Sequence, residues 1–179
     1  MKAKQIAFSG LAIALATVIS TVIKLPNLPN GGSVTLFSML IISMVGYWYG
    51  PAVGLITAVT YGIFQFITGP YFVHPAQVLL DYPLAFGALG ISGFFANKKN
   101  GLIWGYAAGV LGRLLFHEIS GLIFYTTYTS NLQDNLAAIW AVLIYNASYV
   151  LTEGILTLVL LFIPTVKNTL ERLKQLAIS

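Results

Sequence analysis

The sequence predicts an all-α membrane protein with six transmembrane helices, and composition and segment length are the main reasons. Of the 179 residues, 58% are hydrophobic and only 8% are charged, whereas soluble domains carry charge on about a quarter of their residues. A helix rises about 1.5 Å per residue and needs about 20 residues to cross the hydrocarbon core. The chain therefore has room for about six crossings and for no separate soluble domain.

Proline, glycine and charged residues divide residues 1–179 into six apolar segments, which we interpret as one integral membrane domain. The segments lie near residues 4–24, 34–49, 51–69, 75–97, 101–127 and 136–164. The first resembles a signal peptide, but its apolar run continues to Val22, which favours an uncleaved helix. Gly50 and Pro51 separate the second and third segments by a tight turn.

The basic residues predict the orientation of these segments. Seven of the nine lie at the N-terminus, after the fourth segment or at the C-terminus: Lys2, Lys4, Lys98, Lys99, Lys167, Arg172 and Lys174. Six crossings place all seven on one side, and the positive-inside rule predicts that this side, with both termini, is cytoplasmic. The external loops are then near 25–33, 70–74 and 128–135. Because the basic residues cluster at helix ends, we expect lipid rather than nucleic acid as their partner.

Several kinds of chemistry are excluded by missing residues. The chain has no cysteine, which excludes disulfides and thiolate metal sites. "HEISG" (117–121) lacks the second histidine of a zinc-protease motif, because Gly121 stands at that position. No phosphate-binding GxxxxGK[ST] motif is present, so any ATP hydrolysis must come from other subunits. We expect no metal, no cofactor and no enzymatic activity.

Asp81 is the residue that most strongly predicts a binding site. A carboxylate within a membrane span costs about 2.5–3.5 kcal/mol, so it faces a cavity or a partner rather than lipid. Tyr82 follows it and Tyr71 precedes it, and aromatic faces attract cations where water is excluded. We interpret Asp81 as a contact for a cationic ligand, with a buried ion pair to Arg113 as the alternative.

Two further helices bring polar groups to the depth of Asp81. His117, Gly121 and Tyr125 follow i, i+4 and i+8 spacing and form one stripe, which we interpret as a pocket wall. Close helix packing at Gly121 is the alternative. Asn146 lies about three turns into the sixth segment, at the same depth.

The remaining polar residues in the spans have structural interpretations. Arg113 lies one turn deeper than His117, and the spacing favours its pairing with Glu153 below the pocket. Gln65 and Tyr61 either line the pocket or bond between helices. On the first helix, Ala12 and Ala16 form a small-xxx-small pattern that permits close approach of another helix.

Four stretches of the sequence resemble a known family. They are "GGSVTLFSML" (31–40), "YGIFQFITGPYFVHPAQVLLDYPLAFGALGISG" (61–93), "HEISG" (117–121) and "YNASY" (145–149). Together they resemble the thiamine-specific S component of energy-coupling factor (ECF) transporters, the ThiT family. The resemblance covers almost the entire chain, and the 61–93 block is its most specific part.

The resemblance implies a six-helix S-component fold in a bacterial plasma membrane that captures thiamine from outside. Inward release would require a transmembrane scaffold subunit and two cytoplasmic ATPases. By position in the matching motifs, Asp81 would lie near the thiazolium and aminopyrimidine, and His117 and Asn146 would bond the pyrimidine. Aromatic contacts would come from Tyr71, Tyr82 and Tyr125, and scaffold docking from Ala12 and Ala16. Some members carry glutamate in place of Asp81 and a tryptophan in the first external loop.

Rival interpretations remain open at this level. The chain could be an S component for another vitamin or precursor, such as hydroxymethylpyrimidine; riboflavin, uncharged at its ring, would not need Asp81. It could also be an autonomous proton-coupled carrier that uses Asp81, His117 and Glu153 as a relay. An intramembrane hydrolase lacks a nucleophile and a metal set.

Overall fold

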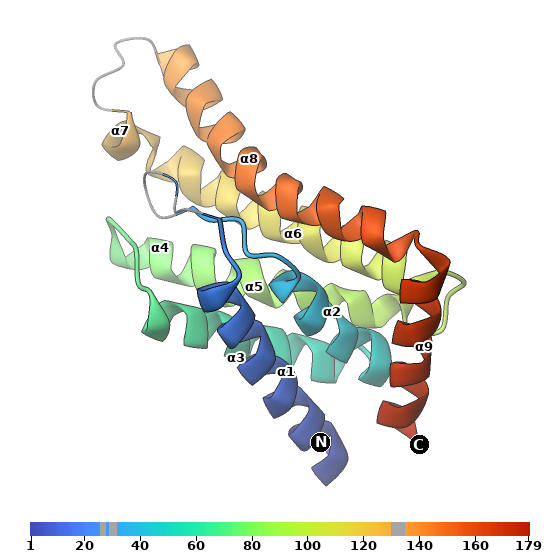
Figure 1. Ribbon diagram of the computed structural model, residues 1–179. Coiled ribbons are helices and arrows are strands. Elements are labelled where there is room, and N and C mark those ends of the chain that lie inside the picture. The colour runs from blue at the N-terminus through green and yellow to red at the C-terminus, as the bar shows by residue number, and fades with distance from the viewer. Residues whose placement is uncertain (26–27, 29–31, 130–134) are drawn as a thin grey trace.

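A computed structural model describes residues 1–25, 28, 32–129 and 135–179, and within these ranges the chain is helical (Figure 1). The only extended pairing in the described ranges is one antiparallel bridge between Lys24 and Thr35. The helices are α1 (Ala3–Val22), α2 (Ser38–Tyr49), α3 (Pro51–Thr68), α4 (Pro75–Leu79), the π-helical turn η2 (Leu80–Leu84), α5 (Ala85–Gly87), the 3₁₀-helix η3 (Ala88–Phe95), α6 (Gly101–Ile123), α7 (Tyr125–Tyr128), α8 (Asn135–Leu161) and α9 (Pro164–Ile178). The all-α prediction is confirmed.

Each of the six predicted segments corresponds to a helix or a helical stretch. Four stretches in the described residues are long and apolar enough to cross a membrane, namely Ala3–Val22, Pro51–Thr68, Pro75–Phe95 and Asn135–Leu161. Helix α2 is apolar but has only 12 residues, and α6 carries Arg113, His117, Glu118 and Ser120 within its 23 residues. Six full crossings therefore stay a prediction. Parts of the expected external loops, residues 26–27, 29–31 and 130–134, lie outside the described residues.

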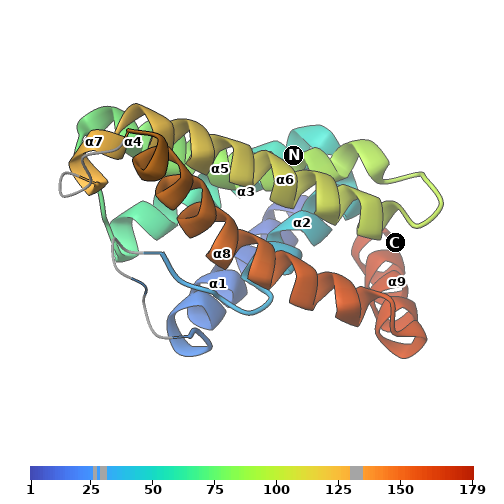
Figure 2. The ribbon, with the colours of Figure 1, turned by 90° about the horizontal axis from the view of Figure 1, so that it is seen from above.

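The stretch from α4 to η3 runs through the centre of the bundle, with α2 and α3 on one side and α6 on the other (Figures 1 and 2). Close packing there depends on small residues. A side chain at Gly90 would collide with the backbone of Gly54 and Leu55 on α3. A side chain at Gly105 would similarly meet Ser92. These glycines let polar backbone segments lie against one another inside the apolar bundle.

Proline interrupts this central stretch at the candidate ligand residue. Pro83 has no N–H and lies inside the π-helical turn η2, where the N–H of Ala85 donates to the carbonyl of Leu80, five residues earlier. The wider turn contains Asp81 and Tyr82. Helix α3 approaches it closely, because a side chain at Gly62 would collide with the Tyr82 carbonyl.

The small-residue face of α1 is packed inside the protein, which corrects one expectation. Ala12 is 4% exposed and Ala16 is 0% exposed. The Tyr61 hydroxyl on α3 donates to the Ala16 carbonyl, and the Thr57 hydroxyl bonds to Ser9. Ala12 and Ala16 do permit close helix approach, but the helices that use it are α2 and α3 of the same chain. They do not present a free docking face.

The three basic parts of the chain, namely the N-terminus, the turn before α6 and the C-terminal helix, lie at one end of the molecule. Helix α9, which the sequence reading did not predict, begins with Pro164 and lies across this end, near both termini (Figure 1). The Lys4 ammonium donates to the Leu176 carbonyl, and Lys167 donates to Asn100 in the turn before α6. This grouping agrees with an even number of crossings, while the side of the membrane that this end faces stays a prediction.

Candidate ligand-binding site

A cavity of about 440 Å³ lies between the central stretch, α6, α8 and the segment before α2. Six of the seven predicted ligand residues line it: Tyr71, Asp81, Tyr82, His117, Gly121 and Asn146. Tyr125 is not among the lining residues. Helix α6 ends at Ile123, and Phe124 leaves the helical conformation (φ −108°, ψ 13°), so the stripe expected from His117 does not continue to Tyr125.

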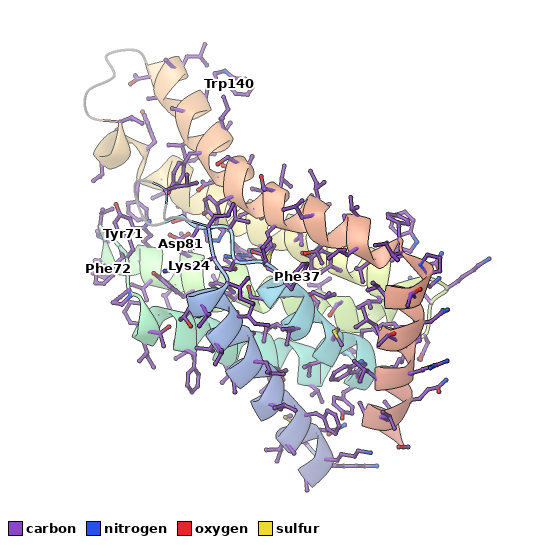
Figure 3. The ribbon with its side chains drawn as sticks, in the orientation of Figure 1. Lys24, Phe37, Tyr71, Phe72, Asp81 and Trp140 are labelled. Carbon is purple, nitrogen blue, oxygen red and sulfur yellow. The ribbon has the colours of Figure 1, made fainter. Side chains whose placement is uncertain are left out.

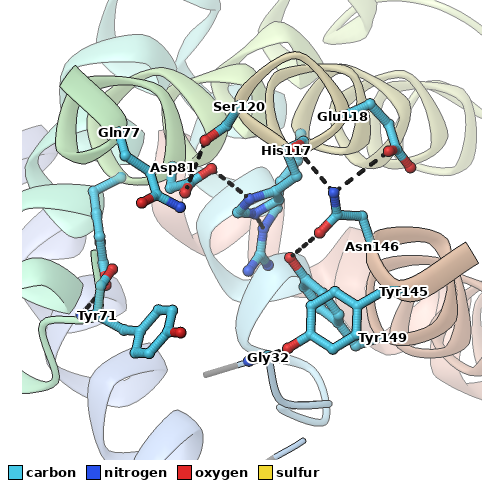
Figure 4. Close-up of polar contacts among 12 residues, drawn as sticks. Gly32, Tyr71, Gln77, Asp81, His117, Glu118, Ser120, Tyr145, Asn146 and Tyr149 are labelled. Atoms are coloured by element: carbon cyan, nitrogen blue, oxygen red, sulfur yellow. Dashed lines mark hydrogen bonds and ion pairs between the residues drawn. The ribbon is translucent and has the colours of Figure 1, made fainter. Parts of the chain in front are cut away.

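Asp81 points its carboxylate at α6 (Figure 4). One oxygen lies 3.0 Å from Nδ1 of His117, and the other accepts a hydrogen bond of 3.1 Å from the Ser120 hydroxyl. Its side chain is 16% exposed. A carboxylate can accept about four hydrogen bonds, so Asp81 keeps capacity for a ligand.

The neighbouring arginine determines which nitrogen of His117 carries the proton. Nε of Arg113 donates to Nε2 of His117 at 3.4 Å, and an arginine always donates because it stays protonated. Nε2 is therefore the acceptor, and Nδ1–H donates to Asp81, which makes His117 neutral. In the described residues no lysine or arginine forms an ion pair with Asp81. Its negative charge has no cationic partner from the chain there.

Asn146 joins α8 to α6 beside this pair. Its amide nitrogen donates to the His117 carbonyl at 2.9 Å and to the Glu118 carboxylate at 3.4 Å, and its oxygen accepts from the Tyr149 hydroxyl at 3.2 Å. A side chain at Gly121 would come within 2.8 Å of the Asn146 amide nitrogen. Gly121 thus lines the cavity and also permits close packing, and Glu118 makes a contact between helices.

The two predicted tyrosines form the opposite edge of the cavity. The Tyr71 N–H donates to the Tyr82 hydroxyl at 2.8 Å, and that hydroxyl donates to the Tyr71 carbonyl at 3.2 Å. The Tyr82 ring packs edge-on against Phe66 at 5.2 Å. Tyr82 therefore holds the connection after α3 in place. Figure 3 shows Tyr71 near Asp81, whereas Trp140 lies apart on α8 and is 56% exposed.

Arg113 and Glu153 do not pair as expected. Arg113 lines the cavity with its guanidinium 4.2 Å from the centre of the Phe86 ring, and no ion pair joins it to Glu153 in the described residues. Glu153 instead accepts hydrogen bonds from the segment before α2, through Thr35, Ser38 and Met39. The pairing of Arg113 with Glu153 was predicted from their positions along two helices. Helical spacing cannot indicate that hydrogen-bond donors of a non-helical segment lie beside Glu153.

Sequence reasoning missed several lining residues. Ser120 lies three residues after His117 and so shares its face of α6, a signal that could have identified it. Tyr145, whose hydroxyl accepts from the Gly32 N–H at 2.8 Å, precedes Tyr149 by four residues and so shares its face of α8, which is a similar signal. Gln65 was not missed: the sequence left open whether it lines the pocket or bonds between helices, and it does both, because it lines the cavity and accepts from Ser20 at 3.3 Å. In the described residues no three histidine, aspartate or glutamate side chains gather as a metal site would require.

Comparisons with known proteins agree with this architecture. The model of the family described as "Thiamine transporter protein (Thia_YuaJ)" matches residues 6–172. The thiamine transporter ThiT of Bacillus subtilis is 32% identical over 172 residues, which cover 88% of this chain and 86% of that protein. A solved structure of ThiT from Listeria monocytogenes has the same fold, with a TM-score of 0.62, 21% identity, and coverage of 91% of this chain and 94% of that chain.

The comparisons confirm the predicted resemblance and the multi-pass membrane architecture. The matched family is one of transporters, not of enzymes. The match extends over both the helices that carry the cavity and the helices that pack against them. This chain belongs to the Thiamine transporter protein (Thia_YuaJ) family.

Proposed function

We propose that this protein is the thiamine-binding subunit of a vitamin uptake transporter and that its cavity binds thiamine. The observation that carries the proposal is Asp81, a carboxylate at the cavity whose protein partners, His117 and Ser120, are both neutral. A buried charge without a counterion is costly. A cationic ligand would supply the missing charge.

The cavity also has the size and lining for such a ligand. Its volume of about 440 Å³ falls in the range of sites that enclose small organic molecules. Phe86, Tyr82, Tyr145 and Tyr149 contribute aromatic surface. Thiamine combines a fixed thiazolium cation with a flat aminopyrimidine, so it can neutralise Asp81 while its rings contact aromatic side chains.

Mass spectrometry of small molecules that co-purify with the protein tests this proposal, followed by calorimetric titration of the ligand-free protein. We expect thiamine in the purified sample and tight binding of added thiamine. Hydroxymethylpyrimidine, which lacks the thiazolium cation, should bind much more weakly. Equal affinity for both would show that the cavity recognises only the pyrimidine and would overturn the role of Asp81.

We further propose that uptake requires an ECF scaffold subunit and two ATPases, because the chain has no phosphate-binding motif of its own. Cells that express this chain alone should bind thiamine without accumulating it, and co-expression of the three partners should restore accumulation. Accumulation by the chain alone, driven by a pH gradient in sealed vesicles, would establish a proton-coupled carrier instead.

The outer face of α1 is the surface that we propose for scaffold docking, in place of Ala12 and Ala16. Gly10, Ala14 and Thr17 line an apolar surface groove together with Phe64 of α3, and nothing lies within 4 Å of the position of a side chain at Gly10. Small exposed residues let helices approach closely in lipid. Gly10→Leu with Ala14→Leu should bind thiamine normally but abolish uptake, whereas normal uptake would exclude this face.

A further inference from the structure

We propose that Glu153 is a positioning residue for the ligand site. Its carboxylate holds residues 32–39 where Gly32, Ser33 and Thr35 form one wall of the cavity. The expected effect on thiamine binding rests on the proposed function. A second measurement, of the position of the wall in the ligand-free protein, does not depend on it.

The hydrogen bonds of Glu153 account for both carboxylate oxygens. Oε2 accepts from the Thr35 N–H at 3.2 Å and from the Thr35 hydroxyl at 2.9 Å. Oε1 accepts from the Met39 N–H at 3.2 Å and from the Ser38 hydroxyl at 3.3 Å. Each oxygen therefore takes one backbone N–H and one hydroxyl. Glu153 is 2% exposed, so water cannot easily replace it.

Helix α2 needs this remote acceptor because its own sequence supplies none. The residue before the helix, Phe37, has a left-handed backbone conformation (φ 70°) and no side chain that can cap the first turn. The first N–H groups of a helix need acceptors, and negative charge is favourable at that end. A left-handed phenylalanine persists only where its surroundings hold it, and Glu153 bonds to residues on both sides of it.

The same segment forms the cavity wall and is held to α8 at a second point. The Gly32 N–H donates to the Tyr145 hydroxyl, and a side chain at Gly32 would lie 2.6 Å from that hydroxyl. At Thr35 the segment forms the bridge to Lys24. Figure 2 shows the described segment that leads directly into α2 beside α8. Tyr145 and Glu153 together fix the wall against α8.

Replacing Glu153 by glutamine tests this role with almost no change of volume. The amide NH₂ must face either the Thr35 N–H or the Met39 N–H, and it cannot accept from either. The two hydroxyls can rotate to accept instead, but a backbone N–H cannot. The substitution therefore leaves one donor facing another donor and should loosen the wall specifically.

A single introduced thiol can report the position of the wall, because the chain contains no cysteine. Ser33→Cys places that thiol in the wall, and its rate of modification by a water-soluble maleimide is measured without ligand. We expect Glu153→Gln to raise this rate about fivefold or more, and to speed thiamine dissociation about tenfold with little change in association, as for one lost hydrogen bond.

Glu171→Gln is the matched control, because it makes the same chemical change at the other end of the molecule, where Glu171 accepts from Tyr47 at 2.7 Å. It should alter neither rate. Thr35→Val provides a milder variant if Glu153→Gln does not fold, since it removes one hydroxyl donor and keeps the Thr35 N–H. It should raise the labelling rate by a smaller factor.

The outcomes separate this inference from the proposed function. Unchanged labelling of Ser33→Cys in folded Glu153→Gln protein, or in Thr35→Val protein if the former does not fold, would overturn the positioning role. Faster labelling combined with no thiamine binding by the unsubstituted protein would leave the positioning role intact and refute the ligand.

Discussion

Asp81 and Glu153 both lie inside apolar helical stretches of this protein, and the surroundings of their carboxylates differ. Asp81 lines the cavity and receives one hydrogen bond on each oxygen, from the side chains of His117 and Ser120. Glu153 is almost fully buried and receives two on each oxygen, including two from backbone N–H groups. The chain satisfies Glu153 completely and leaves Asp81 with capacity for a ligand.

The difference teaches that burial of a charge in a membrane protein does not by itself identify a ligand site. Both residues carry a similar cost of insertion, and both were candidates for a proton relay. What separates them is the number and rigidity of the donors around each carboxylate. Backbone N–H donors, which cannot rotate away, hold Glu153 in a structural role. Asp81 has only side-chain donors and lies beside a cavity, so its carboxylate can also contact a ligand.

Asp81→Asn should produce the largest effect, a loss of thiamine affinity of about thirtyfold or more, equivalent to about 2 kcal/mol. The variant removes the charge that attracts the cation. The melting temperature without ligand should change little, because the Ser120 hydroxyl can rotate to accept from the new amide. Calorimetric titration and thermal unfolding measure the two quantities. Unchanged affinity would make Asp81 a structural residue like Glu153.

Glu153→Gln should show the opposite pattern in thermal unfolding without ligand. We expect a loss of about 1.5 kcal/mol, because a backbone N–H faces an amide NH₂, and a melting temperature lower by about 3–6 °C. The Glu171→Gln protein, unfolded under the same conditions, provides the reference for a half-buried carboxylate outside the site. If Asp81→Asn destabilised the ligand-free protein more than Glu153→Gln did, Asp81 rather than Glu153 would be the structural carboxylate.

Substitutions of His117 test which of its ring nitrogens donates a hydrogen bond to Asp81. Asparagine can place its NH₂ near the position of Nδ1 and donate to Asp81, whereas glutamine places it near Nε2. His117→Asn should therefore bind thiamine about fivefold more tightly than His117→Gln, a difference of about 1 kcal/mol. The reverse order would show that Nε2 carries the proton and that Arg113 does not set the tautomer.

Ser120→Ala should have the smallest effect, a threefold to fivefold loss of thiamine affinity from one neutral hydrogen bond, or about 1 kcal/mol. The exposed Ser148, whose hydroxyl donates to the Tyr145 carbonyl, provides a control, and Ser148→Ala should leave the affinity unchanged. A loss as large as that of Asp81→Asn would show that Ser120 contacts the ligand directly.

The sequence alone was sufficient for the membrane class and for six of the residues that line the cavity. Long apolar runs and few charges leave no soluble alternative. Among the charges within the apolar segments, the neighbouring tyrosines distinguish Asp81 as a contact for a cation. Helical periodicity placed His117 and Gly121 on one face, and position along the sixth segment placed Asn146 at their depth. These inferences succeed because they depend on composition and on distances along a single helix.

Only the tertiary structure decided which neighbours each of these faces meets. The sequence shows that Ala12 and Ala16 have small side chains. Their burial against α2 and α3, however, depends on how whole helices pack. The end of α6 before Tyr125, and the capture of Glu153 by residues 35–39 rather than by Arg113, depend on non-helical backbone. Local periodicity contains no information about such segments; Glu153 and Thr35, for example, are 118 residues apart in the chain.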